Sequence, residues 1–314
     1  MSRSADLDAL PPPGPETLRL KAAYWGYRSA WEAAARLPQR AANRVPTTIG
    51  RSMYLSASVR QRSQVRRNMA RISGLAGTAL ERLVRDAYVS YARYWLDSFR
   101  LHTMNGAEVM RQSSAVNCEA VDELLADGDG AILATGHLGS WDIGAMFSAT
   151  RGWKMTVVAE VVEPRRLFDR FVELRHNAGI DVIPLVRGGD MVSRLEERVR
   201  NGGLATLLAD RDLTRKGPIV EFFGEPCRLP PGVASLARRT GRPVAVGAFF
   251  SKPRGWEGYI EDVIDISDKS IEDGTQALAS VMERLISRHP EQWHVFVPNW
   301  LADREPDHPS LRQV

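Results

Sequence analysis

The feature that most limits the fold is a regular alternation, after residue 130, of short apolar runs with longer segments of helical periodicity. Such alternation is typical of a mostly parallel sheet covered by helices on both faces, with functional loops at the carboxyl ends of the strands. The expected strands are residues 131–135, 155–159, 181–184, 204–209, 244–250, 259–264 and 294–297. The expected helices between them are residues 140–149, 164–178, 191–201, 232–240 and 271–289. The sequence therefore predicts an α/β fold with a mostly parallel central sheet flanked by helices.

Size and cysteine content narrow the class of protein further. A chain of 314 residues can hold one large α/β domain or two smaller ones. With 44% apolar and 25% charged residues, it lies outside the disordered, collagenous and coiled-coil classes. Cys118 and Cys227 are far apart and lack metal-ligand spacing, so we expect no metal site, no disulfide framework and a reducing compartment.

We expect no segment that crosses a bilayer. The longest uncharged apolar runs, such as residues 243–251, are half as long as the roughly 20 residues that a transmembrane helix needs. Asp6 and Asp8, followed by prolines at 11–13, stand where a signal peptide would have its apolar region, so no export signal is expected. These observations predict an intracellular protein, either soluble or attached to a membrane surface.

Charge is distributed unevenly along the chain. The first 100 residues carry 17 Lys and Arg against 7 Asp and Glu, whereas the remaining residues carry 25 against 31. The net charge of +4 is therefore the sum of +10 in residues 1–100, the basic front, and −6 in residues 101–314, the acidic body. A basic front on an acidic body is expected of a chain that meets a polyanion, either nucleic acid or an anionic membrane.

The sequence of the basic front predicts helices. Residues 16–37 combine four aromatic side chains with Arg and Lys, as in helices that lie among lipid headgroups, although they could equally pack on the protein's own core. Residues 51–71 contain six arginines and no acid, and each would contribute about 1 kcal/mol near an anionic leaflet. A solvated helix face and a nucleic-acid site are the alternatives for this segment, but no DNA- or RNA-binding motif accompanies the arginines. Residues 78–101 place apolar side chains at helical spacing, which indicates a core helix.

One loop has the composition of a catalytic site. His137 leaves the first expected strand, glycines surround it, and Asp142 follows in the first turn of a helix. An imidazole can abstract a proton near neutral pH, and a carboxylate on its other nitrogen fixes the tautomer. The helix N-terminus adds donors for a developing oxyanion. The chain has no Gly-x-Ser-x-Gly, P-loop or Gly-x-Gly-x-x-Gly motif, so we expect His137 to activate a substrate hydroxyl directly.

This loop, residues 136–142, resembles the His-x4-Asp/Glu motif of glycerolipid and glycolipid acyltransferases. From about Ala22 to Asp303 the chain is similar to the bacterial lipid A biosynthesis acyltransferase superfamily, and within it to the actinobacterial phosphatidylinositol mannoside acyltransferases. The segments that carry this resemblance are residues 91–95, 158–160, 164–175, 209–214, 221–226, 289–290, 293–294 and 298–303.

The resemblance implies transfer of a fatty acyl chain, palmitoyl in the mannoside enzymes, from acyl-CoA to a mannose hydroxyl. His137 would be the general base and Asp142 its orienting partner, with no covalent acyl-enzyme. The implied partners are an acyl-CoA donor, a glycolipid acceptor and an anionic membrane surface, with no nucleic acid and no cofactor beyond the acyl-CoA co-substrate. The implied location is peripheral, on the cytoplasmic face of the plasma membrane.

The resemblance is imperfect at Asp210, because the mannoside enzymes have Glu-Arg-Asp where this chain has Asp210-Arg211-Asp212. The lipid A enzymes resemble Asp-x-Asp here, so the shorter carboxylate leaves the acceptor open. Asp210 follows an expected strand, at the edge of the sheet where it can meet His137. We expect it to hold the sugar or the imidazolium; the alternative is a structural pair with Arg211.

Further residues are assigned to substrate binding. By resemblance Glu160 contacts sugar or donor, and His294 contacts the acceptor unless it is a core histidine. Arg175 is expected to bind an anionic headgroup or CoA phosphate, with an internal pair to Glu173 or Asp181 as the alternative. Arg228 precedes a helix N-terminus, a natural anion site, and is expected to bind a phosphate. Arg211, beside Asp210, completes the set.

The expected organisation has four parts. Residues 1–15 form a flexible N-terminus, 16–115 a basic helical region that docks on the membrane and covers an acyl tunnel, 116–303 the α/β acyltransferase core, and 304–314 a tail. Two alternatives to the mannoside function remain open. One is an acyltransferase of the lipid A type that acts on another glycolipid, and the other is a non-catalytic protein that binds anionic membranes.

Overall fold

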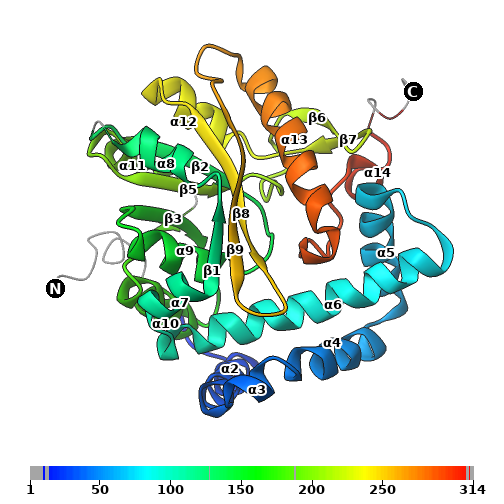
Figure 1. Cartoon of the computed structure of the whole chain (residues 1–314). Helices are drawn as coiled ribbons and strands as arrows, with labels where there is room; N and C mark the ends of the chain where they lie inside the picture. Colours follow the sequence, from blue (N-terminus) through cyan, green and yellow to red (C-terminus); the bar gives the residue numbers. More distant parts are fainter. Residues whose placement is uncertain (1–9, 11–13, 127, 187–188, 309–310, 312–314) are drawn as a thin grey trace.

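A seven-stranded sheet forms the centre of the computed structural model, which describes residues 10, 14–126, 128–186, 189–308 and 311. Its strand order is β1-β9-β8-β2-β5-β3-β4, and the five strands from β8 to β4 run parallel (Figure 1). At the other edge β9 is antiparallel to β8, and β1 is parallel to β9. The strands are β1 (Ser113–Val116), β2 (Ala131–Thr135), β3 (Met155–Glu160), β4 (Asp181–Leu185), β5 (Leu204–Leu208), β8 (Val244–Ser251) and β9 (Trp256–Ile264). The expected mostly parallel α/β sheet is confirmed.

Helices cover both faces of this sheet, as the alternation predicts. One face carries α8, α9 and α10, and the other carries α11, α12 and α13. Their bounds are α8 (Glu119–Leu125), α9 (Trp141–Thr150), α10 (Arg165–Asn177), α11 (Met191–Arg200), α12 (Gly232–Thr240) and α13 (Ile271–Arg288). Side chains alternate along β2, so that Leu133 packs on the α8–α10 face and Ile132 on the α11–α13 face.

The prediction of a strand at residues 294–297 is wrong. This segment forms no strand, and its backbone groups bond with partners outside the sheet. The His294 N–H donates to the carbonyl of His137 at 2.8 Å. The side-chain amide of Asn68 donates to the carbonyls of Val295 and Val297, at 2.7 and 2.9 Å. Because a side chain from a distant helix satisfies these carbonyls, apolar composition alone gave no warning that no strand would form.

Two features of strand pairing were missing from the sequence prediction. The short edge strand β1 was one, and a separate hairpin of β6 (Ile219–Phe222) and β7 (Glu225–Arg228) was the other. Phe223 and Gly224 form the hairpin's two-residue turn with φ of 51° and 73°, a left-handed pair that suits the twist of such hairpins. Strands of four residues are too short to show a clear period of two.

The N-terminal region is helical, as expected. Its helices are α2 (Leu18–Arg36), α3 (Gln39–Ala42), α4 (Val45–Ser56), α5 (Val59–Ser73), α6 (Gly77–Arg100) and α7 (Gly106–Gln112), and α14 (Leu301–Arg304) lies near the other end of the chain. Leu80, Val84 and Tyr88 of α6 are buried in the same hydrophobic cluster as the α11–α13 face of the sheet. The interpretation of residues 78–101 as a core helix is therefore confirmed. The boundary expected at residue 116, between the helical region and the α/β core, falls on the last residue of β1, so β1 belongs to the sheet of the core.

The aromatic side chains of α2 divide between the protein and its surface. Trp31 is buried against Phe99 and Phe171, at ring-centroid distances of 5.5 and 5.0 Å. Trp25, by contrast, is 53% exposed. The α2 helix therefore packs on the body with one side and presents an aromatic ring outward with another.

Several arginines of residues 51–71 bind acids within the fold. Arg66 pairs with Glu81 at 2.7 Å. Arg71 pairs with both Asp303 and Glu225, at 2.5 and 2.9 Å, and Arg67 reaches Asp303 at 3.1 Å. The bonds to Asp303 fasten α5 to α14, whereas those to Glu81 and Glu225 link it to α6 and β7. Arg51 and Arg60 are exposed.

Membrane-spanning helices are absent from the part of the chain that the structure describes, where every helix is too short or too polar to cross a bilayer. The expectations of a flexible start and of a C-terminal tail fall largely on residues 1–9, 11–13, 309–310 and 312–314, which lie outside the described residues.

Candidate active site

His137 lies in a tight loop between the end of β2 and the start of α9. Gly139 in this loop has φ of +62°, and a Cβ there would lie 2.2 Å from the carbonyl oxygen of Phe249. A Cβ at Gly136 would lie 2.9 Å from a carboxylate oxygen of Asp210. Both glycines are therefore required by close packing, and they bring the loop against β8 and against Asp210.

Asp210 is the partner of His137. Its Oδ1 lies 2.9 Å from Nδ1 of His137, and its Oδ2 accepts the backbone N–H of His137 at 2.7 Å. Oδ2 also accepts the indole N–H of Trp293 at 2.8 Å. Burial raises the pKa of Asp210, but the charge and hydrogen bonds of His137, together with Trp293, outweigh burial and hold this pKa below its usual value. Asp210 meets His137, as its place at the edge of the sheet predicts, and the alternative pair with Arg211 is not formed.

Asp142 does not contact His137, which corrects the expected pairing. One oxygen of its buried carboxylate accepts the hydroxyl of Ser98 at 2.7 Å, and the other accepts Nε of Arg175 at 3.0 Å. The first turn of α9 points Asp142 toward α6 and α10, away from the imidazole nitrogen that Asp210 binds. The five-residue spacing thus leaves the two side chains of the motif with different partners.

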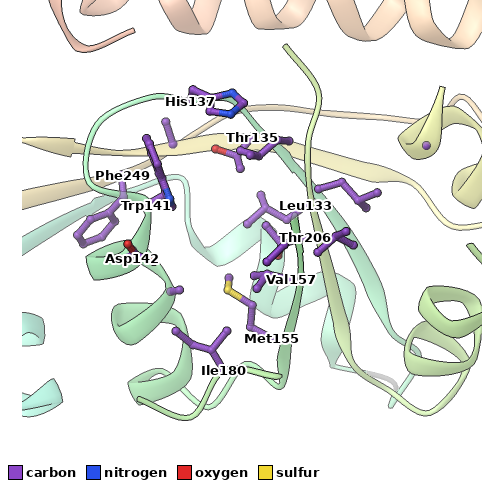
Figure 2. Close-up of a pocket in the computed structure, with 18 of the residues that line it drawn as sticks. Leu133, Thr135, His137, Trp141, Asp142, Met155, Val157, Ile180, Thr206 and Phe249 are labelled. Atoms are coloured by element: carbon purple, nitrogen blue, oxygen red, sulfur yellow. The ribbon is translucent and has the colours of Figure 1, made fainter. Parts of the chain in front are cut away.

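A cavity of about 600 Å³ opens beside His137. Figure 2 shows His137 at one end, and Met155 and Ile180 at the other. Its walls are mostly apolar and lie between α9 and the sheet, along β2, β3 and β5. The wall residues that lie on the α8–α10 side include Leu133, Thr135, Gly144, Ala145, Phe147, Ser148, Trp153, Met155, Val157, Ile180, Thr206, Gly247, Phe249, Gly258 and Ile260.

A second, more polar group of lining residues surrounds the mouth of the cavity. Glu160 ends β3 and lines the cavity, as expected. Arg211 and Thr214 line it from the loop after β5, next to the start of α12. Arg211 makes no ion pair within the residues that the structure describes. The exposed side chains of Val162, Leu185 and Leu213 complete this rim.

The remaining candidate residues have different surroundings. Arg175 lines the cavity, and its Nε pairs with Asp142 at 3.0 Å. The alternative of a pair with Glu173 or Asp181 is therefore wrong, whereas the binding of an anionic group by Arg175 stays a prediction. Burial lowers the pKa of Arg175, but attraction by Asp142 outweighs this and raises the pKa above its usual value.

Arg228 lies away from the cavity, which corrects its expected role as a phosphate ligand. Its guanidinium binds Glu305 at 3.1 Å and the carbonyl of Gly217 at 2.9 Å. The β7 strand directs the side chain toward the C-terminal segment, where a carboxylate already compensates its charge.

His294 is buried beside the loop and is not a lining residue. Its Nε2 lies 2.9 Å from the hydroxyl of Ser90, and its ring packs against Tyr91 and Tyr94. Burial, and then the charge of His137, lower the pKa of His294 to about 3, so the ring is neutral at physiological pH. His294 is thus buried, as the alternative interpretation expects, although its Nδ1 has no hydrogen-bond partner among the described residues.

Four residues of the site were not identified from the sequence. Trp293 and Asn299 hold Asp210, through its carboxylate and its backbone carbonyl respectively. Ser98 binds Asp142, and Tyr94 stacks on Trp141 with ring centroids 3.8 Å apart. Trp293, Asn299 and Tyr94 belong to the segments that carry the family resemblance, which was the available signal. Within the described residues, no three His, Cys, Asp or Glu side chains converge so as to hold a metal ion.

Comparison with known proteins places this geometry in context. Residues 14–302 match the profile of a family described as bacterial lipid A biosynthesis acyltransferase. A protein of Mycobacterium tuberculosis (strain H37Rv) named phosphatidylinositol mannoside acyltransferase is 37% identical over 284 residues, which cover 89% of each chain. A protein of the same name from Mycolicibacterium smegmatis is 34% identical over 281 residues, 88% of this chain and 91% of its own.

Proposed function

The chain belongs to the bacterial lipid A biosynthesis acyltransferase family, and we propose that it transfers a palmitoyl chain from acyl-CoA to a mannose hydroxyl of a phosphatidylinositol mannoside. The observation that carries this proposal is the His137–Asp210 pair at the mouth of a mostly apolar cavity. A base at the mouth suits a hydroxyl acceptor, and an apolar cavity suits an acyl chain.

The contact with Asp210 gives His137 its role. Because the carboxylate accepts from Nδ1, the neutral imidazole carries its proton there and leaves the lone pair of Nε2 for a substrate. Nε2 takes the proton of the sugar hydroxyl as the sugar oxygen forms a bond to the thioester carbonyl carbon. The carbon–sulfur bond then breaks, and the departing thiolate of CoA takes the proton back from His137. No bond forms between the acyl group and the protein.

Asp210 stabilises the charged form of His137 during this transfer. The carboxylate is 0% exposed, so its attraction for an imidazolium is screened little by water. Trp293 and the backbone N–H of His137 bind the same carboxylate and fix its orientation. The first-turn N–H groups of α9, which lack intrahelical partners, start four residues after His137 and would stabilise the oxyanion.

The cavity offers two environments for the two halves of the reaction. The part between α9 and the sheet runs back along β2 from the level of Thr135 to that of Ala131, roughly 13 Å at 3.3 Å per residue. This part would hold the acyl chain. The mouth, with Glu160 and Arg211, which has no ion-pair partner among the described residues, would hold the sugar and an anionic phosphate of donor or acceptor.

The transfer reaction itself is the test of this function. We expect His137→Ala to lose about 10²–10⁴-fold in the transfer of radiolabelled palmitate from palmitoyl-CoA to phosphatidylinositol mannoside. His176→Ala changes an exposed histidine outside the cavity and should keep normal turnover. Near-normal turnover by His137→Ala would reject the mechanism, and a wild-type protein that acylates only other glycolipids would reject the acceptor.

We further propose that the protein works on the cytoplasmic face of the plasma membrane, with the N-terminal helices as its docking surface. Exposed Leu18 and Trp25 of α2 and exposed Arg60 of α5 support this proposal. Flotation with liposomes should recover the protein only when anionic lipid is present, and Trp25→Ala with Arg60→Gln should reduce the recovered fraction several-fold. Equal recovery with neutral liposomes would contradict electrostatic docking.

A further inference from the structure

One face of α6 meets the start of α9 through three successive contacts. Tyr94 stacks on Trp141, and the hydroxyl of Ser98 donates to Asp142. Between them, the carboxylate of Asp97 accepts the hydroxyl of Ser140 at 2.9 Å. Ser140 is the residue that joins the His137 loop to α9, so α6 touches this loop at its junction with the helix.

Asp97 is buried, at 4% exposure, and binds donors from three elements. Besides Ser140, its Oδ2 accepts the indole N–H of Trp256, at the start of β9, at 3.0 Å. Nε of Arg93, one turn earlier on α6, pairs with the carboxylate at 3.1 Å. A buried carboxylate is costly unless such partners compensate it, so this side chain has a fixed position in the fold.

The other side of the loop is held by backbone bonds. The N–H of Gly139 donates to the backbone carbonyl of Gln292 at 2.9 Å, and the N–H of Ser140 donates to the backbone carbonyl of Phe249 at 2.8 Å. The Ser140 hydroxyl also lies 2.9 Å from the hydroxyl of Ser251. Ser140 is thus the point at which α6, β8 and the catalytic loop meet, and Asp97 is the charged member of that junction.

We propose that Asp97 is a positioning residue for acyl transfer, which through Ser140 fixes the loop that presents His137 to the cavity. The proposal rests on the proposed function. Ser140 lies three residues after His137, so its bond to Asp97 ties the catalytic loop to the core helix α6. A displacement of a reacting group by about 1 Å costs on the order of 100-fold in rate. Asp97 does not line the cavity, so it acts on the reaction only through the loop.

The experiment compares Ser140→Ala, Asp97→Ala and the double variant with Trp256→Phe as the matched control. Trp256→Phe removes a hydrogen bond from the same carboxylate but leaves the bond to Ser140. We expect Ser140→Ala and Asp97→Ala each to lower kcat about 10–100-fold, with KM for palmitoyl-CoA nearly unchanged. The double variant should be no slower than the slower single variant, because both changes remove the same Asp97–Ser140 hydrogen bond. Trp256→Phe should lower the melting temperature and keep kcat.

Two results would overturn the proposal. One is a fall in melting temperature with unchanged kcat in both single variants, since Asp97 would then be purely structural. The other is multiplication of the two losses in the double variant, since the residues would then act separately. Ser140→Ala, which deletes one hydroxyl oxygen, keeps the test valid if Asp97→Ala does not fold.

Hydrogen exchange of the amides in residues 136–141 separates this proposal from the proposed function, because it needs no turnover. Exchange that is faster in Ser140→Ala and Asp97→Ala but unchanged in Trp256→Phe supports the positioning role even if palmitoyl transfer is absent in the wild type. Unchanged exchange in all three variants rejects it.

Discussion

The two faces of the central sheet are built from the same strands but are filled differently. On the α11–α13 face, side chains such as Ile132 and Ala134 belong to a large buried cluster that also includes α5 and α6. On the α8–α10 face, their neighbours Leu133 and Thr135 line a cavity. Along β2, the alternation of side chains therefore separates a filled face, which stabilises the fold, from a hollow face, which is available to a substrate. The cavity also reaches the starts of α11 and α12 on the other side of the sheet, at Met191 and Gly232.

Glycines on both sides of the cavity allow its walls to pack closely. Gly144 of α9 and Gly247 of β8 both line the cavity. A Cβ at Gly144 would lie 2.6 Å from Cβ of Phe249, and one at Gly247 would lie 2.6 Å from the side chain of Ile260, so Phe249 and Ile260 fill the space beside these glycines and themselves line the cavity. An empty void lowers stability, which implies that this face was kept hollow for an occupant.

The largest expected effect tests whether the buried carboxylate that binds His137 matters more to the reaction than the buried carboxylate of Asp142, on the hollow face. Asp210→Asn should lower kcat about 10³–10⁴-fold, because an amide cannot stabilise the imidazolium or hold the correct tautomer. Asp142→Asn leaves the His137–Asp210 pair intact and should cost much less, about tenfold, measured as palmitoyl transfer at saturating substrate. Equal losses in the two variants would mean that the contact between His137 and Asp210 does not decide the chemistry.

A second prediction compares one isoleucine from each face. Ile180 and Ile132 are both fully buried, but only Ile180 lines the cavity, at the end far from His137. Either residue changed to Ala should lower the free energy of unfolding by about 2–5 kcal/mol. Only Ile180→Ala should raise the ratio of kcat/KM for stearoyl-CoA to that for palmitoyl-CoA, by about tenfold.

Ile132→Ala is the control for Ile180→Ala in this prediction. Because both variants lose similar packing, a general loss of stability would change the two chain-length ratios alike. A ratio that stays at its wild-type value in Ile180→Ala would show that the end of the cavity does not measure the acyl chain.

The smallest expected effect uses the two cysteines, one on each face. Burial raises the pKa of Cys118, which lines the cavity, to about 11, and that of Cys227, in the filled cluster, to about 12. Both thiols should therefore react slowly with iodoacetamide at pH 8. Cys118 should react several-fold faster than Cys227, and palmitoyl-CoA should slow it, as measured by mass spectrometry of the peptides. Faster labelling of Cys227, or no protection of Cys118, would contradict the comparison.

The sheet was predictable because its strands carry their own signals. Six of the seven strands expected from the sequence are present, since most of them are short apolar runs between helical segments, and β9 directly follows β8. The convergence of His137 and Asp210 followed from one rule, that parallel strands present their carboxyl ends at the same edge. The failure at residues 294–297 arose because the partners of that segment are the side chain of Asn68 and the catalytic loop.

Residue spacing could not decide which carboxylate binds His137. Asp142 is near it in sequence and Asp210 is distant, and only the packing of α9 against α6 and α10 determines that Asp142 turns away. Asp97 gave even less signal, because an acid within an amphipathic helix normally lies on a solvated face. Buried charges depend on donors from other elements, here Ser140 and Trp256, which no local pattern reveals.

The fastening of α5 to the C-terminal segment has a consequence for biosynthesis. Asp303 binds Arg67 and Arg71, Asn68 binds the carbonyls of residues 295 and 297, and the same segment supplies Trp293 to Asp210. A nascent chain from which His137 and Asp210 have already emerged still lacks this last partner. Because the ribosome releases residues 293–303 after His137 and Asp210, the catalytic pair gains its Trp293 partner only once this later segment has emerged, and a chain truncated before it carries no finished active site.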